Sequence, residues 1–253
     1  MAERIPEQSL FQANDYIHFC LKKHHISSLP LPKQCILGFI PHIYTLLKQK
    51  YNAKQIDYLH ARNPLSLFNH NNVPCLFVYP GTGAPMATII MDELIHLGVE
   101  TFLFLGPAGV ITNEVIHPLM VVQSALIDEG TSRHYHVESD LVHCDTELTD
   151  KLSSFLNNHN IDFNTGAVWT TDAPYREVPT KLTAALDKGC LAVDMEASAL
   201  IAVSQFYKKT IAGFLLPQDK IDKNGWSHAN LNHNSSFKLT KILKLAADFI
   251  SEC

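Results

Sequence analysis

The sequence has no run of basic residues longer than a pair, and its charge balance is slightly acidic. The formal net charge of the 253-residue chain is -5 at pH 7, and the pI is near 6.2. Proteins that bind nucleic acid or an anionic membrane surface generally carry a basic patch or stripe. We therefore expect neither nucleic acid nor a membrane among the partners of this protein.

The six cysteines show no CxxC spacing, and no apolar run is long enough to cross a membrane. Several cysteines stand inside apolar runs, where a reduced thiol behaves as a small hydrophobic side chain. The first ten residues, MAERIPEQSL, carry charges of both signs and lack the apolar region of a signal peptide. These absences favour a cytoplasmic protein in a reducing compartment.

Short apolar runs alternate with helical patterns along most of the chain. The helical patterns cover residues 41–50, 85–96 and 235–253, and the apolar runs cover residues 35–39, 75–80, 101–106, 119–127, 165–173, 191–195 and 210–216. Runs of this length between helices are typical of strands in a largely parallel sheet that is covered on both faces. We predict an α/β protein.

No internal repeat, low-complexity tract or shift in composition marks a boundary between domains. Chains of this length often form one α/β domain. We expect a single domain over residues 1–253, with residues 1–34 as an N-terminal extension. The extension would hold a polar helix from about Leu10 to Lys23 and a loop rich in proline and serine.

Glycine-rich or polar segments follow several predicted strands, where α/β sheets bind their ligands. Gly83 in VYPGTGAP and Gly106 in FLGPAGVI would let a ligand approach the backbone, although the third glycine of a dinucleotide fingerprint is missing. In VWTTDAPYREVP, Trp169, Tyr175 and Arg176 offer flat rings and a planar donor fork that suit a heterocycle. The same segment is also ordinary turn chemistry.

Acidic residues follow two other predicted strands. Asp194 and Glu196 in AVDMEASAL end a buried run, and Asp219 follows the next run. Asp194 could simply cap the helix that follows. Glu196 and Asp219 suit a reaction in which positive charge develops on a sugar while a leaving group takes up a proton.

A metal site receives little support from the fourteen histidines. His134 and His136 in HYH would share one face of a strand, but no third ligand can be assigned and no HExxH pattern exists. We predict no metal ion and no organic cofactor.

Several motifs, in order along the chain, resemble the nucleoside phosphorylase superfamily of the uridine phosphorylase and hexameric purine nucleoside phosphorylase type. They are GTGAPMATIIMDELIHLGVETFLFLGPAG, IDEGTSRHY, VWTTDAPYRE, AVDMEASALIAVSQF and the strand end at Asp219. The resemblance runs from about Cys35 to Asp219. It implies one α/β domain around a mixed, partly barrel-like sheet, assembly into a homo-oligomer, and cleavage of the N-glycosidic bond of a small-molecule nucleoside.

The same resemblance implies roles at the sugar. Met195 would pack under the ribose and Glu196 would bind its 2'- and 3'-hydroxyls, while Asp194 stands where the family has a glutamate. His25 is a candidate for the histidine that reaches the ribose of a neighbouring subunit.

At the base, the resemblance implies that Asp219 protonates the leaving group and that Tyr175 and Arg176 line the pocket. The aspartate is a feature of purine-specific members, whereas the TTDAPYRE segment is closer to uridine phosphorylases. The sequence therefore does not name the base.

The phosphate site implied by the family is changed. Gly38 is kept, but His42 stands where an arginine is expected, and Phe104 and Pro107 replace an arginine and a threonine. Losing charge-assisted hydrogen bonds should weaken phosphate binding by orders of magnitude.

Three interpretations remain open. The first is phosphorolysis, with inorganic phosphate as co-substrate held by His42, by backbone groups near Gly38 and Gly106, and by Lys48 or Lys50 of a neighbouring subunit. The second is a nucleosidase that uses water, which Asp194 or His42 would have to activate. The third is a nucleoside-binding protein without catalysis. The retained Glu196 and Asp219 favour an enzyme, and we place phosphorolysis slightly first.

Overall fold

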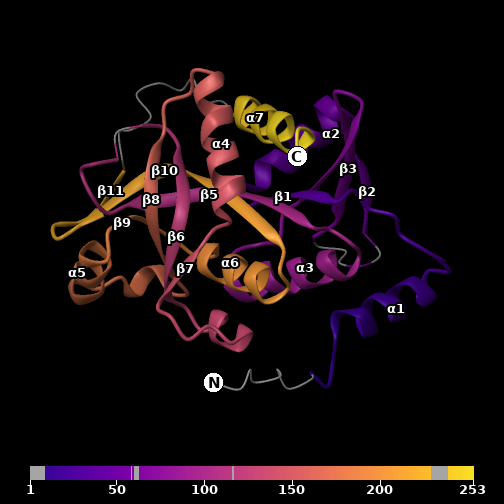
Figure 1. Ribbon diagram of the computed structural model, residues 1–253, viewed down its shortest axis with the longest axis horizontal. Coiled ribbons are helices and arrows are strands. Elements are labelled where there is room, and N and C mark those ends of the chain that lie inside the picture. Colours follow the sequence, from indigo (N-terminus) through magenta and orange to yellow (C-terminus); the bar gives the residue numbers. More distant parts are fainter. Residues whose placement is uncertain (1–8, 58, 60–62, 116, 229–238) are drawn as a thin grey trace.

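A mixed sheet of eleven strands forms the centre of the computed structural model, which describes residues 9–57, 59, 63–115, 117–228 and 239–253 (Figure 1). Both parallel and antiparallel pairings occur across it. The strands are β1 Gln34–Gly38, β2 Lys54–Ile56, β3 Leu65–His70, β4 Val73–Val78, β5 Thr101–Val110, β6 Met120–Asp128, β7 Leu141–His143, β8 Asn164–Thr171, β9 Cys190–Asp194, β10 Thr210–Asp222 and β11 Gly225–His228.

Five of these strands close into a ring. β5 pairs with both β9 and β10, and β8 and β6 connect β9 to β10 on the other side. β9 is antiparallel to β5 and β6 is antiparallel to β10, so the sheet is less parallel than the apolar runs predict. The expected α/β class and the partly barrel-like sheet are confirmed.

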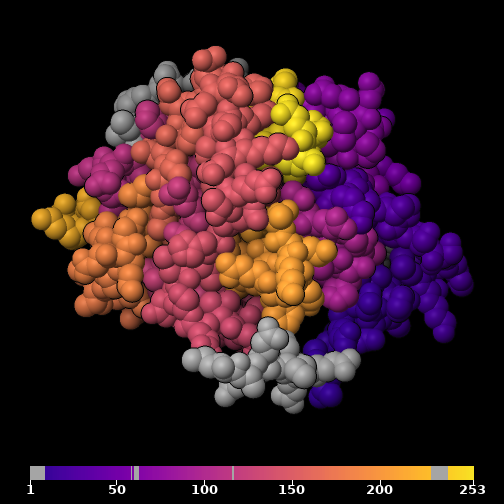
Figure 2. All heavy atoms as spheres, viewed as in Figure 1, coloured from indigo at the N-terminus to yellow at the C-terminus, as the bar shows by residue number. Residues whose placement is uncertain are grey.

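Helices cover the sheet in two groups. α1, α3 and α6 contribute to one apolar cluster with the strands, and α2, α4 and α7 contribute to a second. Figure 2 shows side chains of α4 and α6 on the viewed face of the molecule. The helices are α1 Ala13–Lys23, α2 Pro41–Tyr51, α3 Ala84–His96, α4 Thr146–Asn158, α5 Pro179–Asp187, α6 Ala197–Phe206 and α7 Leu239–Ser251, with 3-10 turns at Ser132–Tyr135 and Pro174–Arg176.

Three expectations need correction. The HYH segment is not a strand: His134 lies in a 3-10 turn, and His136 ends that turn in a left-handed conformation with both imidazoles exposed. The first helix begins at Ala13, not Leu10, whose side chain is fully exposed. β10 continues to Asp222, well past the apolar run, because it pairs with β5 and then with β11. Phe237, expected in the closing helix, lies outside the described residues.

The six cysteines have free thiols, and all except Cys253 are buried, so they pack as small apolar side chains. Among the described residues, no helix is both long and apolar enough to cross a membrane.

Phe104 is part of the core where β5 and β10 pair. Its ring is 1% exposed and lies over Gly213, the residue aligned with it on β10. A Cβ atom at Gly213 would lie 2.4 Å from the ring atoms of Phe104. The glycine is therefore required for this ring to be buried.

We predict that Gly213→Ala lowers the melting temperature by about 3 to 10 °C, because overpacking a core costs about 1–3 kcal/mol. Phe104→Leu should relieve the clash, so the double variant should be more stable than the sum of the two single losses predicts. Thermal unfolding of the four proteins measures the coupling. Additive losses would show that the ring does not impose this constraint.

Candidate active site

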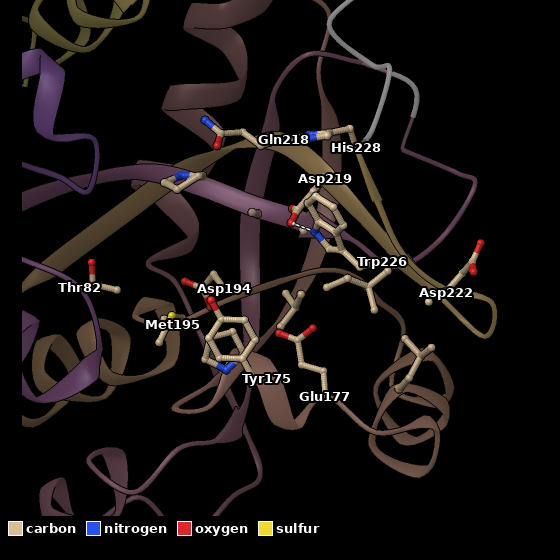
Figure 3. A pocket seen from close by; sticks show the side chains of 18 of the residues that line it. Thr82, Tyr175, Glu177, Asp194, Met195, Gln218, Asp219, Asp222, Trp226 and His228 are labelled. Atoms are coloured by element: carbon tan, nitrogen blue, oxygen red, sulfur yellow. Dashed lines mark hydrogen bonds between the residues drawn. The ribbon is translucent and has the colours of Figure 1, made fainter.

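A cleft of about 1170 Å³ opens at the ends of β5, β9 and β10 (Figure 3). The Pro174–Arg176 turn and the start of α5 border it, and the β10–β11 hairpin forms another wall. The lining residues are Phe39, Thr82, Pro107, Ala108, Gly109, Pro174, Tyr175, Glu177, Pro179, Leu182, Val193, Asp194, Met195, Glu196, Gln218, Asp219, Ile221, Asp222, Lys223, Gly225, Trp226 and His228.

Gly109 sets the spacing between the two strands that carry the acids. It pairs with Val193 of β9 on one side and with Asp219 of β10 on the other. A Cβ atom at Gly109 would lie 3.1 Å from Cγ1 of Val193 and 3.2 Å from Oδ1 of Asp219. Without a side chain at this position, β9 and β10 can both present their ends to one cleft. Glu196, just after β9, and Asp219, on β10, therefore line the same cleft.

Asp194 ties the end of β9 to the start of α6. Its carboxyl is 6% exposed and accepts hydrogen bonds from Thr170 Oγ1 at 2.6 Å and from the N–H of Ala197 at 2.7 Å. The N–H of Glu196 also donates to it, at 3.2 Å. These bonds satisfy free N–H groups of the helix start, as the capping interpretation of the sequence expects. Burial raises the pKa of Asp194 to about 6, although these hydrogen bonds act to lower it.

Glu196 lies between this cap and the open cleft. Its Oε1 accepts a hydrogen bond of 2.6 Å from the N–H of Gly83, at the start of α3. Burial, followed by the nearby charge of Asp194, raises the pKa of Glu196 to about 8. In the empty cleft at neutral pH, this carboxyl is therefore mostly protonated.

A hydrogen-bond network behind Asp194 involves residues that the sequence analysis does not assign. Glu129, at the end of β6, accepts from Ser198 Oγ at 3.0 Å and from the N–H of Ser132. The N–H of Ser198 donates to Thr170 Oγ1 at 3.0 Å, and that hydroxyl donates to Asp194. Glu129 is the glutamate of the IDEGTSRHY motif, and an acidic residue directly after an apolar run is the sequence feature that could have pointed to it.

Aromatic and acidic side chains surround the opposite end of the cleft. Tyr175 is 97% exposed and Trp226 is 61% exposed, so both rings offer free faces to a ligand. Asp219 Oδ2 accepts a hydrogen bond of 2.6 Å from Nε1 of Trp226. Burial, and then the charge of Asp219, raises the pKa of Glu177 to about 7. Figure 3 shows Glu177 and Asp219 on facing sides of this end of the cleft.

The structure brings five of the predicted site residues into the cleft lining: Tyr175, Asp194, Met195, Glu196 and Asp219. Gly83, another predicted site residue, lies outside the lining but donates its N–H to Glu196.

The other predicted site residues lie outside the lining. Arg176 is exposed next to Tyr175, and His25 is exposed after α1. Gly38 and Gly106 serve packing, because a Cβ atom would lie 2.4 Å from the Phe77 ring and 3.0 Å from Phe39, respectively.

The expected phosphate contacts are not assembled by the described residues of one chain. His42 is exposed at the start of α2, outside the lining, and Lys48 and Lys50 are exposed on the same helix. Pro107 lines the cleft, whereas Phe104 is buried in the core and does not. Phe104, which stands where the resemblance implies a phosphate-binding arginine, therefore does not reach the cleft. Groups of three or more metal-ligating side chains are absent from the described ranges.

The site is thus a small-molecule cleft of an α/β protein, with a buried carboxyl at one end and a second carboxyl among aromatic rings at the other. The model of the phosphorylase superfamily matches residues 33–251, and the chain belongs to this family. The described cleft therefore lies within the matched region.

Named relatives include both phosphorylases and a nucleosidase. Guanosine phosphorylase of Halorubrum lacusprofundi is 32% identical over 127 residues, which are 49% of this chain and 52% of that protein. An uncharacterized protein of Acanthamoeba polyphaga mimivirus is 26% identical over 206 residues, 78% of this chain and 80% of the relative. The fold is shared with AMP nucleosidase from Bacteroides thetaiotaomicron, at a TM-score of 0.76 and 20% identity over 96% of this chain and 97% of that one. Membership of the phosphorylase superfamily supports an enzyme.

We predict that Glu196→Gln makes the protein more stable at alkaline pH. Between the ordinary glutamate pKa of 4.5 and its raised value of about 8, the folded state holds a proton that the unfolded state has lost. Stability of the wild type therefore falls as pH rises through this window. The variant keeps a hydrogen-bond acceptor for Gly83 but cannot ionise.

The melting-temperature gain of Glu196→Gln should be near zero at pH 4.5 and about 2 °C or more at pH 8.5. Glu100→Gln is the matched control, because Glu100 is exposed and a hydrogen bond from Lys33 lowers its pKa. A gain for Glu196→Gln that does not change with pH would contradict the prediction.

Proposed function

We propose that this protein cleaves the N-glycosidic bond of a purine nucleoside. The observation that supports this most directly is the position of Glu196 and Asp219, which meet in one cleft on either side of Gly109. In the proposed pose, the sugar lies over Met195 with its hydroxyls on Glu196. The base lies between the exposed rings of Tyr175 and Trp226, with Asp219 at its edge.

In the proposed reaction, the bond from C1' to the base nitrogen breaks and its electron pair goes to the base. Asp219 gives a proton to the base, which leaves as a neutral molecule. The sugar becomes oxocarbenium-like, and ionised Glu196 stabilises the positive charge from within a site of low dielectric. An oxygen nucleophile then bonds to C1'.

Sugar binding should be coupled to ionisation of Glu196. Its pKa of about 8 belongs to the empty cleft, where burial disfavours the charge. Two sugar hydroxyls that donate to the carboxylate would stabilise the ionised form and release the proton. Glu196 would then carry its negative charge only when the sugar that needs it is bound.

Phosphate is the first candidate for the nucleophile because phosphorylases of guanosine and other purine nucleosides are among the relatives. Among the described lining residues, the side chains that can carry positive charge are Lys223 and His228, both on the hairpin at the base end. Phosphate at the sugar would thus need a cation from a neighbouring subunit of a homo-oligomer. Lys48 and Lys50 remain the proposed source.

Water is the second candidate, and the same distribution of charge favours it. A phosphate dianion beside Glu196 would meet a carboxyl and apolar walls such as Phe39 and Pro107, whereas a neutral water would not require a cation. The fold likeness to AMP nucleosidase is consistent with either nucleophile, since it concerns the architecture.

We predict base release from purine nucleosides in a panel of inosine, adenosine, guanosine, uridine, thymidine and methylthioadenosine, tested with and without phosphate. Release that requires phosphate and yields a sugar 1-phosphate would identify phosphorolysis. Release of free sugar at an unchanged rate without phosphate would identify hydrolysis. If no nucleoside is cleaved under either condition, the proposed function is wrong, and calorimetry would then test for binding alone.

We further predict that Asp219→Asn lowers kcat by about 100-fold or more, since general acid catalysis typically contributes 10²- to 10⁴-fold. Glu196→Ala should reduce both affinity and kcat, because the sugar loses its acceptor and its charge partner. Asp187→Asn, at the exposed end of α5 and outside the cleft lining, is the control. Unchanged turnover in Asp219→Asn or Glu196→Ala would remove that residue from the mechanism.

A further inference from the structure

The β10–β11 hairpin places Trp226 next to Asp219. In the antiparallel register, Asp219 lies opposite His228 and Ile221 lies opposite Trp226. Side chains alternate between the faces of a strand, so these four share one face, and all four line the cleft. Trp226 therefore stands diagonally across the hairpin from Asp219, within reach of a long side chain.

The carboxyl of Asp219 is held on two sides. Oδ2 accepts the 2.6 Å hydrogen bond from the indole of Trp226. Oδ1 lies 3.2 Å from the point that a Cβ atom at Gly109 would occupy, so it sits close to the backbone of β5. The indole fixes Oδ2, and Oδ1 is the oxygen that acts on the base in the proposed function. Figure 3 shows the indole of Trp226 next to Asp219, with the dashed line marking this hydrogen bond.

The core does not account for Trp226. The other tryptophan, Trp169, is 1% exposed and binds Asp128 through its Nε1, as a structural indole does. Trp226 is 61% exposed, and its ring contacts His228 with a centroid distance of 4.8 Å. Holding a large ring in the open over a carboxyl contributes little to folding, so a role toward a ligand explains it better.

We infer that Trp226 is a positioning residue that orients Asp219 as the proton donor to the leaving base, an inference that rests on the proposed function. Asp219 carries its proton on Oδ1 and transfers it to a base nitrogen as the bond from C1' breaks. The electron pair of that bond stays with the base, and Asp219 becomes a carboxylate.

The indole N–H favours this transfer. A hydrogen bond to an ionised acceptor is stronger than the same bond to a neutral one. The bond from Trp226 to Oδ2 therefore strengthens as Asp219 loses its proton, and it stabilises the transition state more than the ground state. The effect belongs to kcat, because the substrate complex with protonated Asp219 contains the weaker bond and the transition state contains the stronger one.

Trp226→Phe removes the N–H and keeps an aromatic ring, so it separates positioning from stacking. We expect kcat for the best purine nucleoside of the panel to fall by about 10- to 100-fold, and KM to change by less than about threefold. In the Asp219→Asn background, the same substitution should change kcat by less than about twofold, because there is no proton left to position. Equal melting temperatures would show that each variant is folded.

A substrate that needs no proton gives a second readout. A purine nucleoside methylated at N7, such as 7-methylguanosine, is already positively charged, and its base leaves as a neutral molecule without protonation. Trp226→Phe should therefore slow its cleavage by less than about twofold. Asp187→Asn is again the charge control away from the cleft.

Independent effects of Trp226→Phe and Asp219→Asn on kcat would overturn the inference, as would a rise in KM with kcat unchanged, which indicates stacking alone. Equal slowing of the methylated and unmethylated nucleosides would overturn it as well. In each of these cases nucleoside cleavage by the wild type still stands. If the wild type cleaves no nucleoside, the proposed function fails, and this role of Trp226 fails with it.

Discussion

The burial of acidic side chains where β9 meets α6 is the constraint on which the rest of the site depends. An unpaired carboxylate in this position would be strongly disfavoured, and the structure provides hydrogen-bond donors to it from two elements. Thr170 comes from β8, and the N–H groups of Glu196 and Ala197 come from the start of α6. Ser198 and Glu129 extend the network to β6. With Asp194 fixed in this way, the backbone directs Glu196 into the cleft.

The closure of five strands into a barrel-like ring brings the second acid, Asp219, to the cleft. β5 is the shared neighbour of β9 and β10, and Gly109 keeps their ends close enough to border one cavity. An open sheet in chain order would separate these two strand ends. The cleft is therefore a property of the barrel as a whole, and small changes in the pairing of β5 with β10 should be felt at Asp219.

The strands and helices that the sequence analysis names could be predicted because their apolar runs are long and their boundaries carry proline and glycine, whereas β3, α4 and α5 were missed. The short strands β2, β7 and β11 could not, because a run of three or four residues gives too little periodicity to separate a strand from a loop. The β10–β11 hairpin did leave a signal, since Asn224 lies in its two-residue turn and Gly225 directly follows, and both residue types favour turns. The prediction of a strand at the HYH segment was wrong because an alternating pattern of only three residues also fits a turn.

For the site, chemistry at strand ends pointed to Asp194, Glu196 and Asp219, and the family resemblance added roles for their neighbours. Trp226 and Glu177 were missed for one physical reason: each reaches the cleft through a turn whose path the sequence does not fix. His42 and His25 show the reverse case, since alignment to a motif gives a position along the chain but not a place in the cavity. A residue's neighbours across the sheet decide that place.

The changed phosphate site is tied to the packing of the core, beyond the exchange of single contacts. Phe104, which stands where the family resemblance implies an arginine, is buried over Gly213 in the β5–β10 pairing. A guanidinium there would need both a route to the cleft and relief from the apolar residues around it. Pro107, two residues before Gly109, removes a further backbone donor from the same strand end. Phosphate binding in this chain would therefore have to be built from outside β5, which is why the nucleophile and the oligomeric state are a single question.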